Sequence, residues 1–186
     1  GTLSDEEDTK LKAAIEALPE TVRRIINERS GTIRNLAMRH LRVRHWLFLG
    51  KGLYYPIALE SALKMKEVSY IHSEGMPAGF LKHGTLALID EAVNTLVFTP
   101  GRAEAALHAA VHSGAEEVKA RRGHIVGFTH DPDDLFDERV ELPSLHPLVD
   151  PLLQLVVGQL FSYFTAVGLG RNVDKPRSLA KSVTVP

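Results

Sequence analysis

Apolar residues recur every three or four positions through the first 45 residues, which is the stripe of an amphipathic helix. Ser4 followed by Glu7 forms a capping-box pattern and predicts that a helix begins there. Pro19 suits the first position of a second helix, and Ser30-Gly31 predicts a further break. The sequence therefore predicts a helical arm made of separate helices. Its apolar stripe consists of Leu11, Ile15, Leu18, Val22, Ile25, Ile26, Ile33, Leu36 and Leu41.

From residue 46 onward, short apolar runs alternate with longer segments of helical pattern. A further apolar run at 86–89 could belong to either a strand or a helix. Apolar strands separated by helices indicate a parallel sheet covered on both faces, so the predicted class is α/β. The predicted strands are 46–49, 95–98, 124–129 and 139–142, and the predicted helices are 55–70, 103–120 and 148–169.

One predicted helix is apolar enough to raise the question of a membrane. The stretch 151–170 carries no charged side chain and is about as long as a membrane span. It contains Gln154 and Gln159 and is bounded by Asp150 and Arg171, so we interpret it as a helix buried inside a globular protein. The start of the chain is acidic and polar, unlike a secretory signal. We therefore expect a cytoplasmic protein with no membrane partner.

The composition excludes several kinds of site. With no cysteine, the chain has no disulfide, no cysteine-ligated metal and no thiol nucleophile. Its 22 basic and 23 acidic residues leave a net charge of −1, so we expect no nucleic-acid partner and interpret Arg39, Arg42 and Arg44 as a solvated helix end. His108 and His112 have a metal-binding spacing, but no third ligand is evident. We expect no metal site.

Three short patterns could carry chemistry. The Gly-Lys-Gly sequence at 50–52 follows a predicted strand and could bring backbone amides to an anion, although a tight turn accounts for it as well. Lys64 and Glu67 lie three residues apart on one helix face, where the carboxylate could act as a general base or form a simple ion pair. His83 stands beside a glycine in a predicted loop, either merely exposed or able to shuttle protons.

Three blocks of sequence, in order, resemble the isomerase half of the glutamine–fructose-6-phosphate transaminase (glucosamine-6-phosphate synthase) family. They are residues 55–72 (YPIALESALKMKEVSYIH), 77–84 (PAGFLKHG) and 174–185 (DKPRSLAKSVTV). The resemblance covers essentially the whole chain. It implies the sugar-isomerase (SIS) fold, a three-layer αβα sandwich around a mostly parallel sheet.

The resemblance also implies a longer parent chain. Members of the family have a glutaminase with a catalytic cysteine and then two SIS domains, and this chain resembles only the second SIS domain. The lack of an initiator methionine, and of the Ser/Thr-rich loop with which the first SIS domain grips the sugar phosphate, makes us expect a fragment. The implied organisation is a helical connector at 1–45, the second SIS domain at 46–170 and an irregular active-site tail at 171–186.

By position, the resemblance assigns roles to five residues. Glu67 matches a glutamate proposed to move a proton between C1 and C2 of the sugar, and Lys64 matches a lysine that would steady charge on oxygen. His83 matches a histidine proposed to open the sugar ring in the neighbouring subunit, which implies a homodimer. Lys181 matches a tail lysine beside the open-chain sugar, which needs a free amine to form a Schiff base. The backbone at Ala180 would line the same site.

The implied activity is the sugar-isomerisation half of the conversion of fructose 6-phosphate and glutamine to glucosamine 6-phosphate. No cofactor is expected, and the fragment alone should be inactive or nearly so. The sequence departs from the family at Phe80, where glutamate is commoner, and at Thr85, where proline is, and both flank His83. Two alternatives stay open: a tandem-SIS glucosamine-6-phosphate deaminase or isomerase, and a non-catalytic phosphosugar-binding SIS module.

Overall fold

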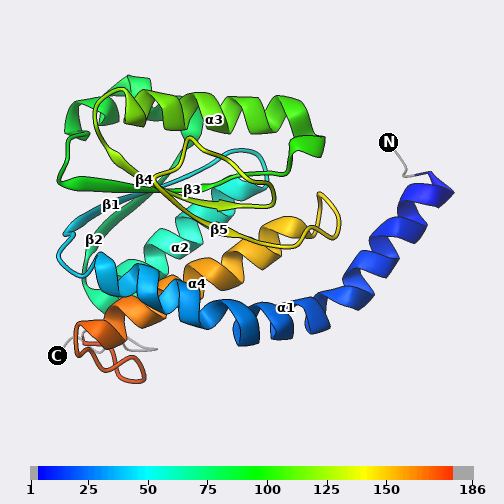
Figure 1. Cartoon of the computed structure of the whole chain (residues 1–186), viewed down its shortest axis with the longest axis horizontal. Helices are drawn as coiled ribbons and strands as arrows, with labels where there is room; N and C mark the ends of the chain where they lie inside the picture. Colours follow the sequence, from blue (N-terminus) through cyan, green and yellow to red (C-terminus); the bar gives the residue numbers. More distant parts are fainter. Residues whose placement is uncertain (1–3, 178–186) are drawn as a thin grey trace, which may run out of the picture.

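In the computed structural model, which describes residues 4–177, a sheet of five parallel strands lies at the centre (Figure 1). The strands pair side by side in the order β2-β1-β3-β4-β5, and every pair is parallel. This arrangement confirms the predicted α/β class. The strands are β1 (His45–Gly50), β2 (His72–Pro77), β3 (Val93–Phe98), β4 (His124–Thr129) and β5 (Glu138–Glu141).

Helices cover both faces of the sheet, which confirms the predicted three-layer αβα sandwich (Figure 1). Helices α2 (Tyr54–Ser69) and α4 (Asp150–Gly168) pack on one face, and α3 (Ala105–Lys119) packs on the other. Helix α1 (Asp5–Arg39) lies outside α4 and packs along it. Three short 3-10 helices fill connections between these elements: η1 (Ala78–His83), η2 (Thr85–Leu88) and η3 (Arg102–Glu104). The ambiguous run at 86–89 thus lies mostly in η2.

Successive side chains of the central strands enter opposite cores, as the pleat of a strand requires. In β1, Trp46 and Phe48 belong to the core that α1, α2 and α4 complete, whereas Leu47 and Leu49 belong to the core under α3. Strands β3 and β4 repeat this alternation. Burial on both faces demands continuous apolar runs, and this is why the sequence pattern identified these strands.

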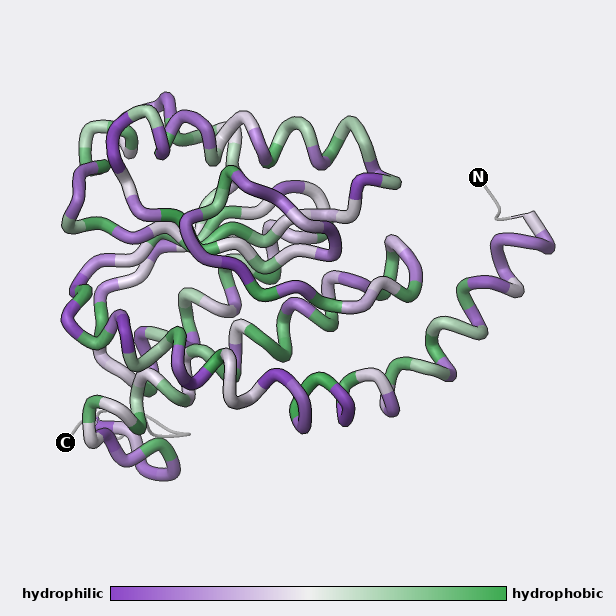
Figure 2. The backbone as a smooth tube through the Cα atoms, viewed as in Figure 1, coloured by the Kyte–Doolittle hydropathy of each residue, from purple (hydrophilic) through white to green (hydrophobic). Residues whose placement is uncertain are grey.

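Helix α1 is one continuous helix, so the breaks predicted at Pro19 and at Ser30-Gly31 are wrong. Figure 1 shows the helix curving along its length, and Figure 2 shows hydrophobic and hydrophilic residues alternating along it. Its buried residues continue across both positions, from Ala14 to Ala37, so packing of this stripe outweighs the hydrogen bond that proline cannot make. The Ser30 hydroxyl donates to the carbonyl of Ile26 within the helix.

Strand β2 is an edge strand that no apolar run predicted. Its side chains are only partly buried: His72 and Glu74 are exposed, and Ser73 and Met76 are buried. It hydrogen-bonds to β1 in register from His45↔His72 to Gly50↔Pro77. An edge strand faces a partner on one side only, and charged residues there discourage pairing with other chains. The signal that marks the central strands is therefore missing from β2.

Helix α4 is long and apolar enough to cross a membrane by length and composition, and half of its apolar window is buried. Leu153, Val157 and Phe161 are completely buried in the core. The Phe161 ring packs edge-on against Trp46, with 5.1 Å between ring centroids, and also against Phe128, at 6.3 Å. These contacts support the interpretation of α4 as a core helix.

Two helical glycines should respond in opposite ways to the same substitution. A Cβ at Gly158 in α4 would lie 2.3 Å from Ser61 Oγ and 3.0 Å from Ser61 Cβ in α2, so Gly158→Ala should force the helices apart. We expect it to lower the free energy of unfolding by about 1–3 kcal/mol. A Cβ at Gly31 in α1 would meet nothing within 4 Å, so Gly31→Ala should raise it by up to ~1 kcal/mol.

Urea unfolding of the two variants and the parent chain measures both effects under the same conditions. The Ser61→Gly background serves as a control, because it removes the side chain that a new Cβ at position 158 would meet. The loss caused by Gly158→Ala should be smaller in that background. An unchanged or increased stability of Gly158→Ala in the parent chain would show that α2 and α4 do not need this close approach.

Candidate functional site

Lys64 and Glu67 form an ion pair on the solvent-facing side of α2. The Lys64 ammonium donates to Glu67 Oε2 at 2.7 Å and lies 3.4 Å from Glu60 Oε1. All three side chains are between one quarter and two fifths exposed. The hydrogen bond to Glu67 is the main cause that raises the pKa of Lys64 above its usual value. At neutral pH Lys64 is therefore a cation that can balance negative charge, and not a base.

The course of the chain puts this pair toward the amino-terminal edge of the sheet. Helix α2 begins after β1 ends at Gly50, and it must return to where the parallel strand β2 begins at His72. Glu67 lies near the end of that return. Ligands of α/β sheets usually bind at the carboxyl ends of the strands. The Glu67 carboxylate lies at the opposite edge of the sheet.

His83 lies on the other face of the sheet from Glu67. Leu81 of η1 is buried in the core beneath α3, whereas Met65 of α2 is buried in the core on the opposite face. His83 itself is exposed, and its ring centroid is 5.3 Å from that of the exposed Phe80. Among the described residues, His83 makes no hydrogen bond or ion pair with Glu67 or Lys64. The structure therefore joins Lys64 to Glu67 but does not bring His83 to them within one chain.

Ala180 and Lys181 lie outside the described residues, but the segment that leads to them contacts the end of α2. The backbone N–H of Arg177 donates to the Tyr70 hydroxyl at 2.8 Å, and its guanidinium lies 4.3 Å from the centre of the Tyr70 ring. The Arg171 guanidinium lies 5.3 Å from the same ring. Tyr70 comes directly after α2, three residues beyond Glu67. Sequence reasoning missed Tyr70, because nothing local distinguishes it from any aromatic residue at a helix end.

The loop at 50–52 forms a tight turn. The N–H groups of Tyr54 and Tyr55, which begin α2, donate to the carbonyls of Lys51 and Gly52. Gly52 has φ +58°, a conformation that glycine adopts without strain. The first two amides of α2 are thus used within the turn.

A cleft of about 510 Å³ opens between α1 and the carboxyl-terminal edge of the sheet. Its wall includes Glu104, whose pKa is raised by burial and by the nearby Asp150. Tyr54 Oη lies 3.5 Å from Glu104 Oε1. Asp150 accepts hydrogen bonds from Ser144 Oγ and from two backbone N–H groups. The lining also includes Lys10 and His146, but none of Lys64, Glu67 and His83 lines this cleft.

His108 and His112, the pair with metal-ligand spacing, both face Asp133, and His108 also contacts the Pro100 carbonyl. His108 Nδ1 lies 2.8 Å from the Pro100 carbonyl oxygen, and His112 Nε2 lies 3.2 Å from Asp133 Oδ2. The second nitrogen of His108 is 4.0 Å from the same carboxylate oxygen. The imidazoles are held by hydrogen bonds and ion pairs that fasten α3 to the loops beyond β3 and β4.

Comparison with known proteins identifies the family of this chain. The SIS domain model matches residues 41–139, which is more than half of the chain. Glutamine–fructose-6-phosphate aminotransferase (isomerizing) of Methanocaldococcus jannaschii is 39% identical over 186 residues, covering all of this chain but 16% of that protein. The enzyme of the same name from Thermus thermophilus is 39% identical over 189 residues, with 31% of its length covered. The chain therefore spans less than a third of these relatives.

A solved structure agrees with the sequence match. The C-terminal domain of glucosamine-fructose-6-phosphate aminotransferase from Francisella tularensis superposes with a TM-score of 0.83 at 33% identity. The match covers 93% of this chain and 49% of that one. The parallel strand order, the flanking helices and the matched segment 41–139 agree: this chain belongs to the SIS domain family.

Proposed function

We propose that this chain supplies the second SIS domain of an enzyme that converts fructose 6-phosphate and glutamine to glucosamine 6-phosphate, and that it serves the sugar-isomerisation half. The observation that carries the proposal is the contact of Arg177 with Tyr70, which brings the chain toward Lys181 beside the end of the helix that bears Glu67. The similarity to isomerizing aminotransferases over the whole chain supports the same enzyme class.

In this proposal Glu67 is the base that interconverts ketose and aldose. It removes a proton from C1, the C1–H electron pair forms the C1=C2 double bond, and the carbonyl π pair moves to the oxygen on C2. The C2 oxygen takes up the proton that the C1 hydroxyl releases, and return of the carbon-bound proton to C2 then leaves the carbonyl at C1. Lys64, a cation that already contacts the Glu67 carboxylate, would balance the negative charge that develops on oxygen.

The separation of His83 from Glu67 supports a homodimer. The two side chains lie on opposite faces of the sheet, yet both would act on one acyclic hexose. The exposure of His83 on η1 leaves it free to enter the site of a second copy and open the sugar ring there. Lys181 would approach the open-chain sugar from the tail, and the backbone of Ala180 would line the same site.

The remainder of the parent enzyme would complete this surface. Leu59 and Leu63 of α2 are 43% and 40% exposed beside Lys64 and Glu67, a face that the first SIS domain would cover. The phosphate grip and the supply of ammonia from glutamine would come from the first SIS domain and the glutaminase. We propose a cytoplasmic enzyme that needs no cofactor for this chemistry. The 39% identity to aminotransferases favours this proposal over a deaminase, and the paired Lys64 and Glu67 favour it over a purely sugar-sensing module.

The tail contact gives the first prediction. Tyr70→Phe removes the hydroxyl that accepts the Arg177 N–H but keeps the ring under the guanidinium. A hydrogen bond of about 1 kcal/mol holds this segment, so we expect trypsin to cleave after Arg177 about fivefold faster in the variant. Mass spectrometry of a limited digest measures the rate. Tyr163→Phe, at an exposed tyrosine of α4, is the control and should digest as the parent does. An equal rate in Tyr70→Phe would contradict the docking of the tail.

The role of Glu67 can be tested in a complete enzyme. In a chimera, this chain replaces the matching segment of the Thermus thermophilus relative, and formation of glucosamine 6-phosphate is measured. Glu67→Gln should lower kcat by about 10²–10⁴-fold with a much smaller change in KM, because it removes the base and keeps the shape. Glu74→Gln, at an exposed glutamate of β2, should leave kcat within about twofold. A chimera that keeps full activity with Glu67→Gln would refute the assignment.

Mixed dimers test whether His83 acts in the other subunit. A Glu67→Gln chimera and a His83→Asn chimera, each inactive alone, are unfolded together, refolded together and assayed. Half of the refolded dimers are mixed. If His83 acts in the partner subunit, each mixed dimer has one intact site out of two, so about a quarter of the parental activity should return. If both residues act within one chain, no mixture regains activity.

A further inference from the structure

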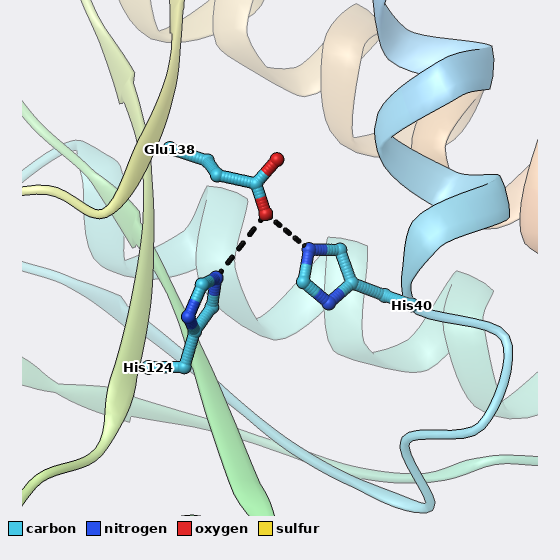
Figure 3. A group of neighbouring side chains, drawn as sticks. All are labelled: His40, His124 and Glu138. Atoms are coloured by element: carbon cyan, nitrogen blue, oxygen red, sulfur yellow. Dashed lines mark hydrogen bonds and ion pairs between the residues drawn. The ribbon is translucent and has the colours of Figure 1, made fainter.

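Two imidazoles and one carboxylate converge where three elements meet at the amino-terminal edge of the sheet (Figure 3). His40 follows α1, His124 begins β4 and Glu138 begins β5. The Nε2 atoms of His40 and His124 lie 2.5 Å and 3.2 Å from the same oxygen, Glu138 Oε1. A potential ligand atom of each residue lies within 4.8 Å of the other two. His40 is 98 residues from Glu138, so no sequence motif could reveal the group.

Each imidazole has a polar group at its second nitrogen. The side-chain amide of Asn94, which is 4% exposed, lies 3.0 Å from His40 Nδ1. Asp137 Oδ2 lies 3.9 Å from His124 Nδ1. Histidines that bind metals in proteins almost always donate their other ring N–H to a carboxylate, a carbonyl or water. Asn94 lies within hydrogen-bond distance of His40, whereas Asp137 lies near His124 but beyond that distance.

A metal ion binds neutral imidazole and ionised carboxylate, so it displaces any proton held on the ligand atoms. Glu138 can present one of its two oxygens to such an ion. Arg39 contacts Oε2, which leaves Oε1 to face the two rings.

We propose that His40, His124 and Glu138 bind a divalent transition ion of the zinc class, which fastens the end of α1 to β4 and β5. Two imidazoles with one carboxylate suit zinc, whereas magnesium and calcium prefer oxygen ligands alone. Tetrahedral zinc at about 2.0–2.2 Å holds its ligand atoms about 3.3 Å apart, so the separations of the two Nε2 atoms from Glu138 Oε1 need to change by less than about 1 Å. The fourth position is left for water.

Binding requires a small proton and amide rearrangement. In the metal-free geometry, the Asn94 amide donates to His40 Nδ1, so His40 Nε2 carries the proton and donates to Glu138. The ion takes the lone pair of Nε2, and the ring proton then resides on Nδ1. A rotation of the Asn94 amide by half a turn presents its oxygen to that proton without changing the shape of the side chain.

The single tryptophan of the chain reports on this site. Trp46 packs edge-on against His40, with 5.5 Å between ring centroids. Titration of the 186-residue chain with Ni²⁺ should quench the fluorescence of Trp46, and Zn²⁺ should displace Ni²⁺ and restore it. His124→Gln should weaken Ni²⁺ and Zn²⁺ binding at least about tenfold. His124 is one-third exposed, so this variant should fold, and far-ultraviolet circular dichroism verifies that it does.

A matched control separates this site from general binding to the nine histidines of the chain. Two other histidine pairs among the described residues are close, His108–His112 and His45–His72, and the second adjoins Trp46. His112→Gln disrupts the first pair and His72→Gln the second, and both variants should leave the quenching and the affinity unchanged. Excess Zn²⁺ should also raise the Tm of the parent and of His112→Gln by several degrees, but not that of His124→Gln or Glu138→Gln, because only a metal held by the folded state stabilises it. Absence of quenching and of a Tm shift in the parent, or their persistence in His124→Gln, would leave the group as an ion-pair network and overturn the proposal.

Discussion

All five strands are parallel, so every connection must return the chain from the carboxyl-terminal to the amino-terminal edge of the sheet. Helix α2 makes this return on one face, and α4, which follows the last strand, packs on the same face, while η1, η2 and α3 lie on the other. The ends of α2 and α4 therefore reach the same edge on the same face, and the contact between Tyr70 and Arg177 joins them there. His83 belongs to a connection on the opposite face. The topology thus separates His83 from the Lys64–Glu67 pair within one chain.

Close helix packing fixes where the tail leaves the domain. At Gly158, α4 approaches Ser61 of α2 so closely that no side chain fits between them. Near its end, Gly168 approaches Met38 and Leu41, which lie at and just beyond the last turn of α1, and a Cβ there would lie 2.5 Å from Met38 Cε. The ends of α1, α2 and α4 therefore meet, and the segment from Arg171 onward begins at that meeting point. A metal ion at His40 would fix the end of α1 at this meeting point. The proposed metal site and the proposed sugar site would therefore lie in neighbouring parts of the domain.

The sequence predicted the parts of the fold that are set by burial on both sides. Strands β1, β3 and β4 and helix α4 carry continuous apolar runs, which are typical of elements packed against protein on every side. Strand β2 was not predicted, because it is an edge strand with exposed polar residues and so has no continuous apolar run. The continuity of α1 through Pro19 was not predicted, because the packing of its long buried stripe outweighs the local tendency of proline to end a helix. That packing is visible only in the tertiary structure.

The candidate site, like the fold, was predicted from the sequence only in part. Spacing on a helix put Lys64 beside Glu67, and the structure joins them. The contacts of Tyr70 with Arg177, and the grouping of His40 with His124 and Glu138, depend on long-range topology and left no trace in the sequence pattern. The positions of Ala180 and Lys181 stay predictions, because they lie outside the described residues.

The exposure of the Lys64–Glu67 pair accounts for why catalysis would need more than this chain. Ion pairs that face water contribute little, because the solvent screens both charges. When a neighbouring domain and the tail cover the same pair, the local dielectric falls and each charge acts more strongly on a bound sugar. Water that would compete for the carboxylate is also excluded. In this view α2 presents a preformed pair whose charges become effective for proton transfer only after the remainder of the enzyme closes over them.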